Sequence, residues 1–140
     1  MKIIILFISI LFLVSCTSVK VFYNNDISYQ DIYPNDRTLK VLKAEGNGTT
    51  IIFLTSGFEK DVAKISNSTT VFLDESRINS GWIGLGCYKV VKNDENITVK
   101  FSNVSLHLVK EDLQKYNYVY IKKKDKDYSV EFTNKPKVFL

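Results

Sequence analysis

Residues 116–133 read YNYVYIKKKDKDYSVEFT, in which two segments rich in aromatic and β-branched residues are joined by a short charged one. This pattern is typical of a β-hairpin. A two-residue turn at Asp125 and Lys126 gives the two strands one dry face and one wetter face. The dry face pairs Val119 with Phe132 and Ile121 with Val130, and the wetter face pairs Tyr118 with Thr133 and Tyr120 with Glu131. A three-residue turn would shift the register by one residue and pair the tyrosines with Val130 and Phe132 instead.

Three tyrosines in this stretch, Tyr116, Tyr118 and Tyr120, occupy alternate positions and therefore share one face of the predicted strand. Beside Lys122 they would form an aromatic stripe at or near the surface, which predicts a surface for a ligand or partner. Tyrosine also favours strands, so packing within the sheet is the simpler interpretation. The lysine-rich tip at 122–127 is typical of a solvated turn, with contact to anionic lipid headgroups as the functional alternative.

Short apolar or alternating segments recur through the rest of the chain, separated by clusters of Asn, Gly, Asp and Ser. This pattern predicts an all-β fold. The expected strands cover residues 19–23, 38–44, 50–55, 61–65, 70–74, 87–91, 97–101, 105–109, 116–122 and 128–133, with one helical turn at 110–115. We expect an antiparallel β-sandwich of about eight short strands, with immunoglobulin-like and C2-like topologies as candidates and a small β-barrel as the alternative.

Composition narrows the class of protein. The chain has 140 residues, 45% of them hydrophobic, which is enough for the core of one domain. Only two cysteines are present, which excludes a disulfide scaffold. The formal net charge of +4 is too small to indicate a nucleic-acid partner.

Residues 81–86, GWIGLG, contain half of the six glycines and the only tryptophan. The spacing differs from the G-x-G-x-x-G pattern of dinucleotide sites, and no helix pattern follows it. We therefore expect a turn in which the glycines permit positive φ while Trp82 closes the end of the core. The functional alternative places Trp82 on a loop, where it stacks on a ligand such as a sugar ring.

The N-terminus, MKIIILFISILFLVSC, has one basic residue followed by an apolar run over residues 3–14 that only Ser9 interrupts. This is typical of a secretory signal peptide. Twelve helical residues span about 18 Å, well short of the roughly 30 Å hydrocarbon core, so a permanent membrane-spanning helix is the poorer interpretation.

The signal ends in Leu13-Val14-Ser15-Cys16, which resembles the lipobox of bacterial lipoproteins at all four positions. The resemblance implies a diacylglycerol on the Cys16 thiol, cleavage before Cys16, and acylation of the new amino group. Two or three acyl chains hold a protein stably on a membrane, whereas one does not. Ordinary signal cleavage that leaves Cys16 free is the alternative. The expected division is therefore a cleaved signal peptide at 1–15, a lipidated N-terminus and loop with one short strand at 16–36, and the β-sandwich at 37–140.

The residue after the lipobox predicts where such a lipoprotein would reside. Thr17 stands where Asp would indicate retention in the inner membrane, so the resemblance favours the outer membrane. No acidic run follows Cys16, and the periplasmic face is therefore the expected location.

A lipidated Cys16 would leave Cys87 as the only other thiol, so no intrachain disulfide is expected. We interpret Cys87 as a buried, inert thiol and His107, the single histidine, as solvated. A catalytic pair of Cys87 and His107 is the alternative. One histidine and no calcium-loop spacing predict no metal site, and no motif indicates a cofactor.

These observations predict a membrane-anchored bacterial lipoprotein with a non-catalytic β-domain. Its partner would be an envelope protein, a glycan or a small ligand, with Trp82, the three tyrosines and Lys122 as the candidate surface. A small cell-envelope hydrolase that uses Cys87 and His107 is one alternative, and a structural envelope subunit is another.

Overall fold

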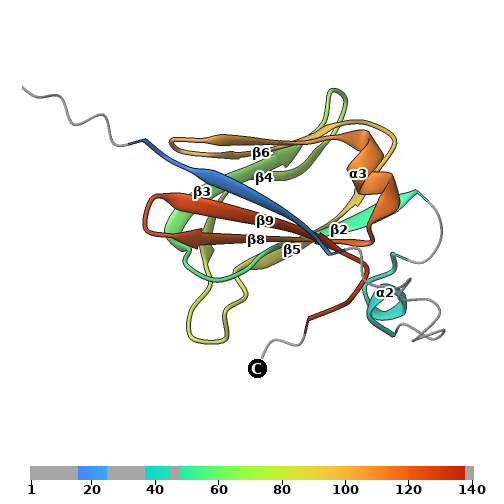
Figure 1. Ribbon diagram of the computed structural model, residues 1–140, viewed down its shortest axis with the longest axis horizontal. Helices are drawn as coiled ribbons and strands as arrows, with labels where there is room; N and C mark the ends of the chain where they lie inside the picture. Colours follow the sequence, from blue (N-terminus) through green and yellow to red (C-terminus); the bar gives the residue numbers. More distant parts are fainter. Residues whose placement is uncertain (1–15, 25–36, 45–47, 138–140) are drawn as a thin grey trace, which may run out of the picture.

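The computed structural model describes residues 16–24, 37–44 and 48–137, which fold into two β-sheets and two short helices (Figure 1). The strands are β1 (Val19–Asn24), β2 (Thr49–Leu54), β3 (Glu59–Ser66), β4 (Val71–Asn79), β5 (Cys87–Lys92), β6 (Ile97–Phe101), β7 (Ser105–Leu108), β8 (Tyr118–Lys124) and β9 (Asp127–Thr133). The helices are α2 (Arg37–Val41) and α3 (Lys110–Lys115). The predicted signal peptide lies outside the described residues, as does the predicted loop after Asn24 as far as residue 36.

The molecule is a β-sandwich. A five-stranded sheet has the order β1-β9-β8-β2-β5, and a four-stranded sheet has the order β4-β3-β6-β7. Each sheet has two edge strands among the described residues, so the predicted sandwich is confirmed and the alternative of a closed barrel does not apply. Figure 1 shows both helices at one end of the sandwich and the turn between β8 and β9 at the other.

The β8–β9 hairpin has the register predicted for a two-residue turn. Val119 lies opposite Phe132, Ile121 opposite Val130, and Lys124 opposite Asp127. Asp125 has a φ of 56°, the left-handed conformation that such tight turns require and that Asp tolerates.

The main core lies between the two sheets. Val119 and Ile121 from β8 are fully buried there with Ile52 and Leu54 from β2, in agreement with the predicted dry face. Neither face of β2 is exposed to solvent, because every residue from Thr50 to Leu54 is buried. A strand covered on both sides is expected to be apolar throughout, and its central place in the sheet explains the sequence TTIIFL.

The prediction that Tyr118 and Tyr120 lie on a wetter face of the hairpin is wrong. Tyr118 and Tyr120 are 0% and 1% exposed, and they pack with Ile51, Phe53 and Ala44 in a second apolar cluster on the outer face of the five-stranded sheet. Four partly buried residues pack against this cluster and help to cover it, namely Leu39, Leu42, Leu85 and Val90. The alternation of β8 is as predicted, but the residues around it in the sequence do not indicate that a second layer covers its outer face.

The strand predicted at 38–44 is wrong, because residues 37–41 form α2. The sequence TLKVLKA fits both structures: Leu39 and Val41 alternate as in a strand, and Leu39 and Leu42 have the three-residue spacing of a helix. In the fold Leu39 and Leu42 contact the tyrosine cluster, whereas Val41 is 76% exposed. The tertiary contact therefore selects the helical pattern.

The other predicted elements are confirmed, including β1 and the helical turn that becomes α3. β4 is longer than expected and runs to Asn79. The expected antiparallel pairing holds for five pairs of strands, but β1 pairs with β9 and β2 pairs with β8 in parallel. Each parallel pair is joined by a long stretch of chain, which is what a parallel pairing requires. The folded unit therefore includes residues 19–24 as well as 48–133.

Candidate functional site

The predicted tyrosine stripe does not form an accessible surface. Tyr116 is 3% exposed and belongs to the main core, while Tyr118 and Tyr120 belong to the second cluster. The three side chains therefore do not share one face. β8 begins only at Tyr118, and Tyr116 is the C-cap residue that follows α3. Of the five residues predicted for a ligand surface, only Trp82 and Lys122 are exposed.

Trp82 does not close the end of the core, because its side chain is 92% exposed. The neighbouring Ile83 is 43% exposed. The loop is fixed at both ends, since the Ser80 N–H donates to the Phe58 carbonyl and the Gly86 N–H donates to the Leu54 carbonyl, at 2.9 and 2.8 Å. The loop is therefore held at both ends, and its apolar tip is exposed to solvent. Such high exposure is unusual for a tryptophan.

We call the end of the sandwich that carries the β8–β9 turn the hairpin end. It comprises Ser18, Lys20, residues 56–60, the loop 80–86 and residues 122–129. A hollow of about 640 Å³ lies there. Its lining includes Lys20, Ser56, Gly57, Lys122, Lys123, Lys124 and Asp127.

The start of the described chain is fixed to this hairpin. The Ser18 N–H donates to Asp127 Oδ1 at 2.9 Å, and the Tyr128 N–H donates to the Ser18 carbonyl at 2.9 Å. Hydrogen bonds from Ser18, first from its side chain and then from its backbone N–H, lower the pKa of Asp127. Cys16 is exposed and lies only two residues before Ser18, so its sulfur stays within about 10 Å of the hairpin turn region.

A second contact ties the hairpin to the opposite sheet. Lys123 Nζ lies 2.5 Å from Asp61 Oδ1 on β3, and both side chains are largely shielded from solvent. The hydrogen bond with Asp61 raises the pKa of Lys123. Lys123 therefore serves the fold, whereas Lys122 and Lys124 on either side of it are exposed.

A groove of about 380 Å³ runs between β1 and β7, the edge strands of the two sheets on one side of the sandwich. Its lining is mainly apolar and includes Val19, Val21, Tyr23, Leu106, His107, Leu108 and Val109. Tyr23 stacks on Phe132 with 5.3 Å between ring centroids, and its hydroxyl donates to Asp112 Oδ2 at 2.8 Å. That hydrogen bond raises the pKa of Tyr23. No described strand pairs with the outer edge of β1.

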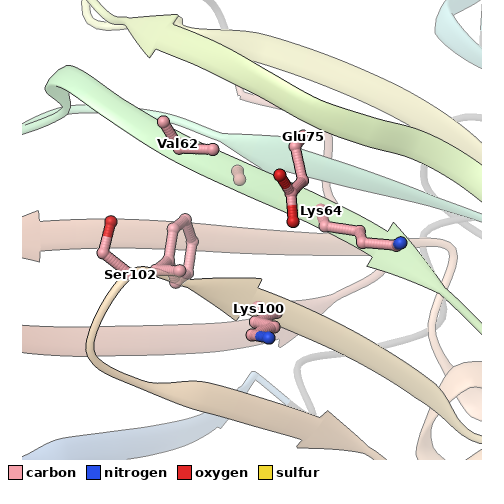
Figure 2. Close-up of a pocket in the computed structure, with 7 residues that line it drawn as sticks. Val62, Lys64, Glu75, Lys100 and Ser102 are labelled. Atoms are coloured by element: carbon pink, nitrogen blue, oxygen red, sulfur yellow. The ribbon is translucent and has the colours of Figure 1, made fainter.

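The outer face of the four-stranded sheet carries a shallow depression of about 280 Å³. Figure 2 shows Glu75, Lys64 and Lys100 around it, with Val62 and Ser102 toward one end. The Lys64 ammonium points along the sheet, and it lies 3.6 Å from Asp74. Charges of both signs on an open sheet face are typical of a solvated surface, and we assign no site here.

Cys87 and His107 are far apart in the fold. Cys87 begins β5, the edge strand that contacts β4, whereas His107 lies on β7 at the opposite edge, beside β1. Burial raises the pKa of the Cys87 thiol, which disfavours the thiolate that a nucleophile needs. His107 is exposed, and its Nδ1 lies 3.4 Å from Thr98 Oγ1. The fold does not bring the two residues of the alternative hydrolase site together.

Within residues 16–24, 37–44 and 48–137, no cluster of three or more His, Cys, Asp or Glu side chains is arranged to hold a metal ion. The helices in those segments are too short to cross a bilayer. Comparisons with protein-family models, with curated proteins and with solved structures gave no match.

Sequence reasoning missed Ser18 and Lys20 as parts of the hairpin end. Ser18 meets Asp127 across 109 positions of sequence, and nothing local to either residue signals that contact. The one available signal was the short distance between Cys16 and the first predicted strand, which left no room for a linker.

Proposed function

We propose that this protein is a lipid-anchored, non-enzymatic component of a bacterial cell envelope, held by acyl chains on Cys16. The expected location is the periplasmic face of the outer membrane. In this proposal the β-sandwich serves as a binding module that works close to the membrane surface.

The observation that carries the proposal is the short distance along the chain between Cys16 and Ser18, which is bonded to the hairpin end. The lipobox supplies the anchor, and the two hydrogen bonds of Ser18 leave no flexible linker between anchor and fold. An exposed cysteine three positions before β1 suits a protein that must stay at a defined height above a bilayer.

Metabolic labelling tests the anchor. Cells that express the full chain and grow on labelled palmitate should label the protein, and Cys16→Ala should abolish the label. Cys87→Ala is the matched control, because that thiol is half-buried in the fold and should keep the label at the wild-type level. A Cys16→Ala protein that still carried the label would overturn the proposal.

The groove between β1 and β7 is the surface best suited to a partner. An extended segment of an envelope protein could add to the outer edge of β1 and place alternate apolar side chains in the groove, which is a common mode of peptide recognition. Four of the six residues of β1 are large apolar residues that are 42–52% exposed, Val19, Val21, Phe22 and Tyr23. Exposed apolar strand edges are usually protected unless they are used.

Site-specific photo-crosslinking in living cells tests this surface. A photoreactive residue in place of His107, which is exposed and lines the groove, should give a protein adduct. The same residue in place of Lys100, which is exposed on the outer face of the four-stranded sheet, should not. Equal adducts from both positions, or none from His107, would exclude the groove as the partner site.

A further inference from the structure

Three features that are far apart in the sequence meet at the hairpin end. Cys16 approaches it through Ser18, the lysines of the β8–β9 turn form its rim, and the loop that carries Trp82 projects from it. Figure 1 shows the start of β1 and the β8–β9 turn at the end of the sandwich away from both helices, and the yellow-green loop between β4 and β5 extending below the sheets.

We propose that the hairpin end is a second membrane-contact site, in which Trp82 and Ile83 enter the lipid headgroup region while Lys20, Lys122 and Lys124 contact anionic lipid phosphates. This inference rests on the proposed anchor at Cys16. It adds that the domain lies on the bilayer in one orientation instead of swinging on a tether.

Acylation of Cys16 would hold the hairpin end near the bilayer. Two residues of extended chain reach at most about 7 Å, so Ser18 and the hairpin to which it bonds must stay close to the headgroups. The loop at 80–86 belongs to the same end, because Gly86 bonds to Leu54, and Leu54 is the partner of Ile121 just before the lysine run.

The loop has the chemistry of an interfacial anchor. Tryptophan is enriched at membrane–water interfaces because its ring is apolar and its N–H is polar. In solution Trp82, at 92% exposure, contributes almost no packing to the fold. Insertion of Trp82 and the adjacent Ile83 would bury this apolar surface without disturbing the core.

The charges at this end favour an anionic surface. Its lysines are Lys20, Lys60, Lys122, Lys123, Lys124 and Lys126, and the carboxylates in it or next to it are Glu59, Asp61, Asp125 and Asp127. Asp61 is engaged by Lys123 and Asp127 accepts from Ser18, so two of the four carboxylates are satisfied internally. Lysines near an anionic leaflet are attracted by its negative surface potential.

The single tryptophan of the chain provides the test. The lipidated protein is purified from membranes and reconstituted into phosphatidylethanolamine–phosphatidylglycerol vesicles that contain lipids brominated near the headgroup. Trp82 emission should fall at least about twofold relative to unbrominated vesicles, because a ring in the interface lies within contact distance of the bromines. We call the opposite end of the sandwich, which carries α2 and α3, the helix end; Lys92 lies there because it ends β5 opposite Thr49, the first residue of β2. In the double variant Trp82→Phe/Lys92→Trp, the only tryptophan lies at the helix end, and its emission should change little.

Charge variants test the lysines. Lys122→Glu/Lys124→Glu should reduce the quenching of Trp82, whereas Lys40→Glu/Lys92→Glu, at the helix end, should not. Quenching should also be weaker in neutral phosphatidylcholine vesicles. Equal quenching at both ends of the molecule, no quenching of Trp82, or no effect of Lys122→Glu/Lys124→Glu would overturn the proposed contact.

Measurements on the same samples distinguish a failure of the membrane-contact site from a failure of the proposed lipid anchor. A protein that floats with the vesicles and carries labelled palmitate, but whose Trp82 is not quenched, would refute only the membrane-contact site. A protein that neither floats nor carries the label would refute the proposed function itself.

Discussion

Gly57 lies just after β2, and its α-carbon faces the backbone of Lys123. A Cβ at this position would lie 1.7 Å from the Lys123 carbonyl oxygen, and the φ of 89° is unfavourable for any other residue. Gly57→Ala should therefore lower the free energy of unfolding by about 3 kcal/mol or more, since backbone would have to move. Urea unfolding monitored by circular dichroism measures the change.

Gly84 is the matched control for that substitution. Its φ is 73°, but a Cβ there would meet no atom within 4 Å. Gly84→Ala should cost only the conformational penalty of about 1–2 kcal/mol. If both variants lost the same stability, the close approach of the chain at Gly57 to Lys123 would be contradicted.

The ion pair of Lys123 and Asp61 should make stability depend on pH in the alkaline range. The hydrogen bond from Lys123 to Asp61 raises the pKa of Lys123 above its ordinary value of 10.5. Because the folded state holds the proton more tightly than the unfolded state, this contribution is complete below pH 10.5 and is lost as pH rises through the folded pKa. The stability difference between wild type and Lys123→Met should therefore shrink above that pH.

Lys122→Met is the control at the neighbouring, exposed position. At neutral pH we expect Lys123→Met to lower the free energy of unfolding by about 1 kcal/mol and Lys122→Met to leave it within about 0.5 kcal/mol. Thermal unfolding at several pH values checks both statements. A difference that grew with rising pH would have the wrong sign for this pair.

At the scale of elements, a buried hydroxyl on β2 bonds to the C-terminal end of α3. Thr50 Oγ1 on β2 donates to the Leu113 carbonyl at 2.6 Å and lies 3.3 Å from the Tyr116 carbonyl. The Asn93 side chain donates to the Leu113 carbonyl as well, at 3.3 Å. These bonds satisfy carbonyls at the end of α3 that the short helix cannot satisfy itself.

Thr50→Val should therefore destabilise the fold by about 1–3 kcal/mol, because it keeps the shape of the side chain but removes the shorter of the two hydrogen bonds to the buried Leu113 carbonyl. Amide hydrogen exchange should accelerate most in α3. Thr98→Val serves as the control, because the Thr98 side chain is only partly buried on β6 and its contact with His107 is long, at 3.4 Å. Equal effects of the two substitutions would argue against this role of Thr50.

Elements were predictable from the sequence where local pattern and tertiary contacts agree. The β8–β9 hairpin is such a case, because its alternation and its two-residue turn select a single register. α2 is the opposite case, since Leu39 and Leu42 fit two periods and the tyrosine cluster decides between them. The outer cover on Tyr118 and Tyr120 could not be predicted, because α2 and the loop residue Leu85 come from distant parts of the chain.

At the scale of the whole molecule, the candidate site was only partly predictable for the same reason. The sequence singled out Cys16, Trp82 and Lys122 one by one, but not that their segments share one end. That juxtaposition depends on the parallel pairing of β1 with β9, which begins with Val19 opposite Tyr128. Long-range pairing of this kind leaves no local signature.

β1 therefore belongs to the fold and also leads to the predicted anchor. Its start is bonded to the hairpin through Ser18, and near its end Tyr23 stacks on Phe132 and bonds to Asp112. Replacement of residues 19–24 by glycine and serine should leave palmitate labelling intact, because the lipobox is unchanged. It should lower the melting temperature by about 10 °C, since the apolar edge of β9 would be uncovered.

Phe22→Ser is the control for that replacement, because Phe22 is 52% exposed and alternates with the groove-lining Val21 and Tyr23. It should change the melting temperature by no more than a few degrees. A segment replacement that left the melting temperature unchanged would show that β1 is only a linker. In the replacement variant a flexible segment would join the anchor to the sandwich, so the bilayer would no longer constrain the orientation of the sandwich and Trp82 quenching should be lost.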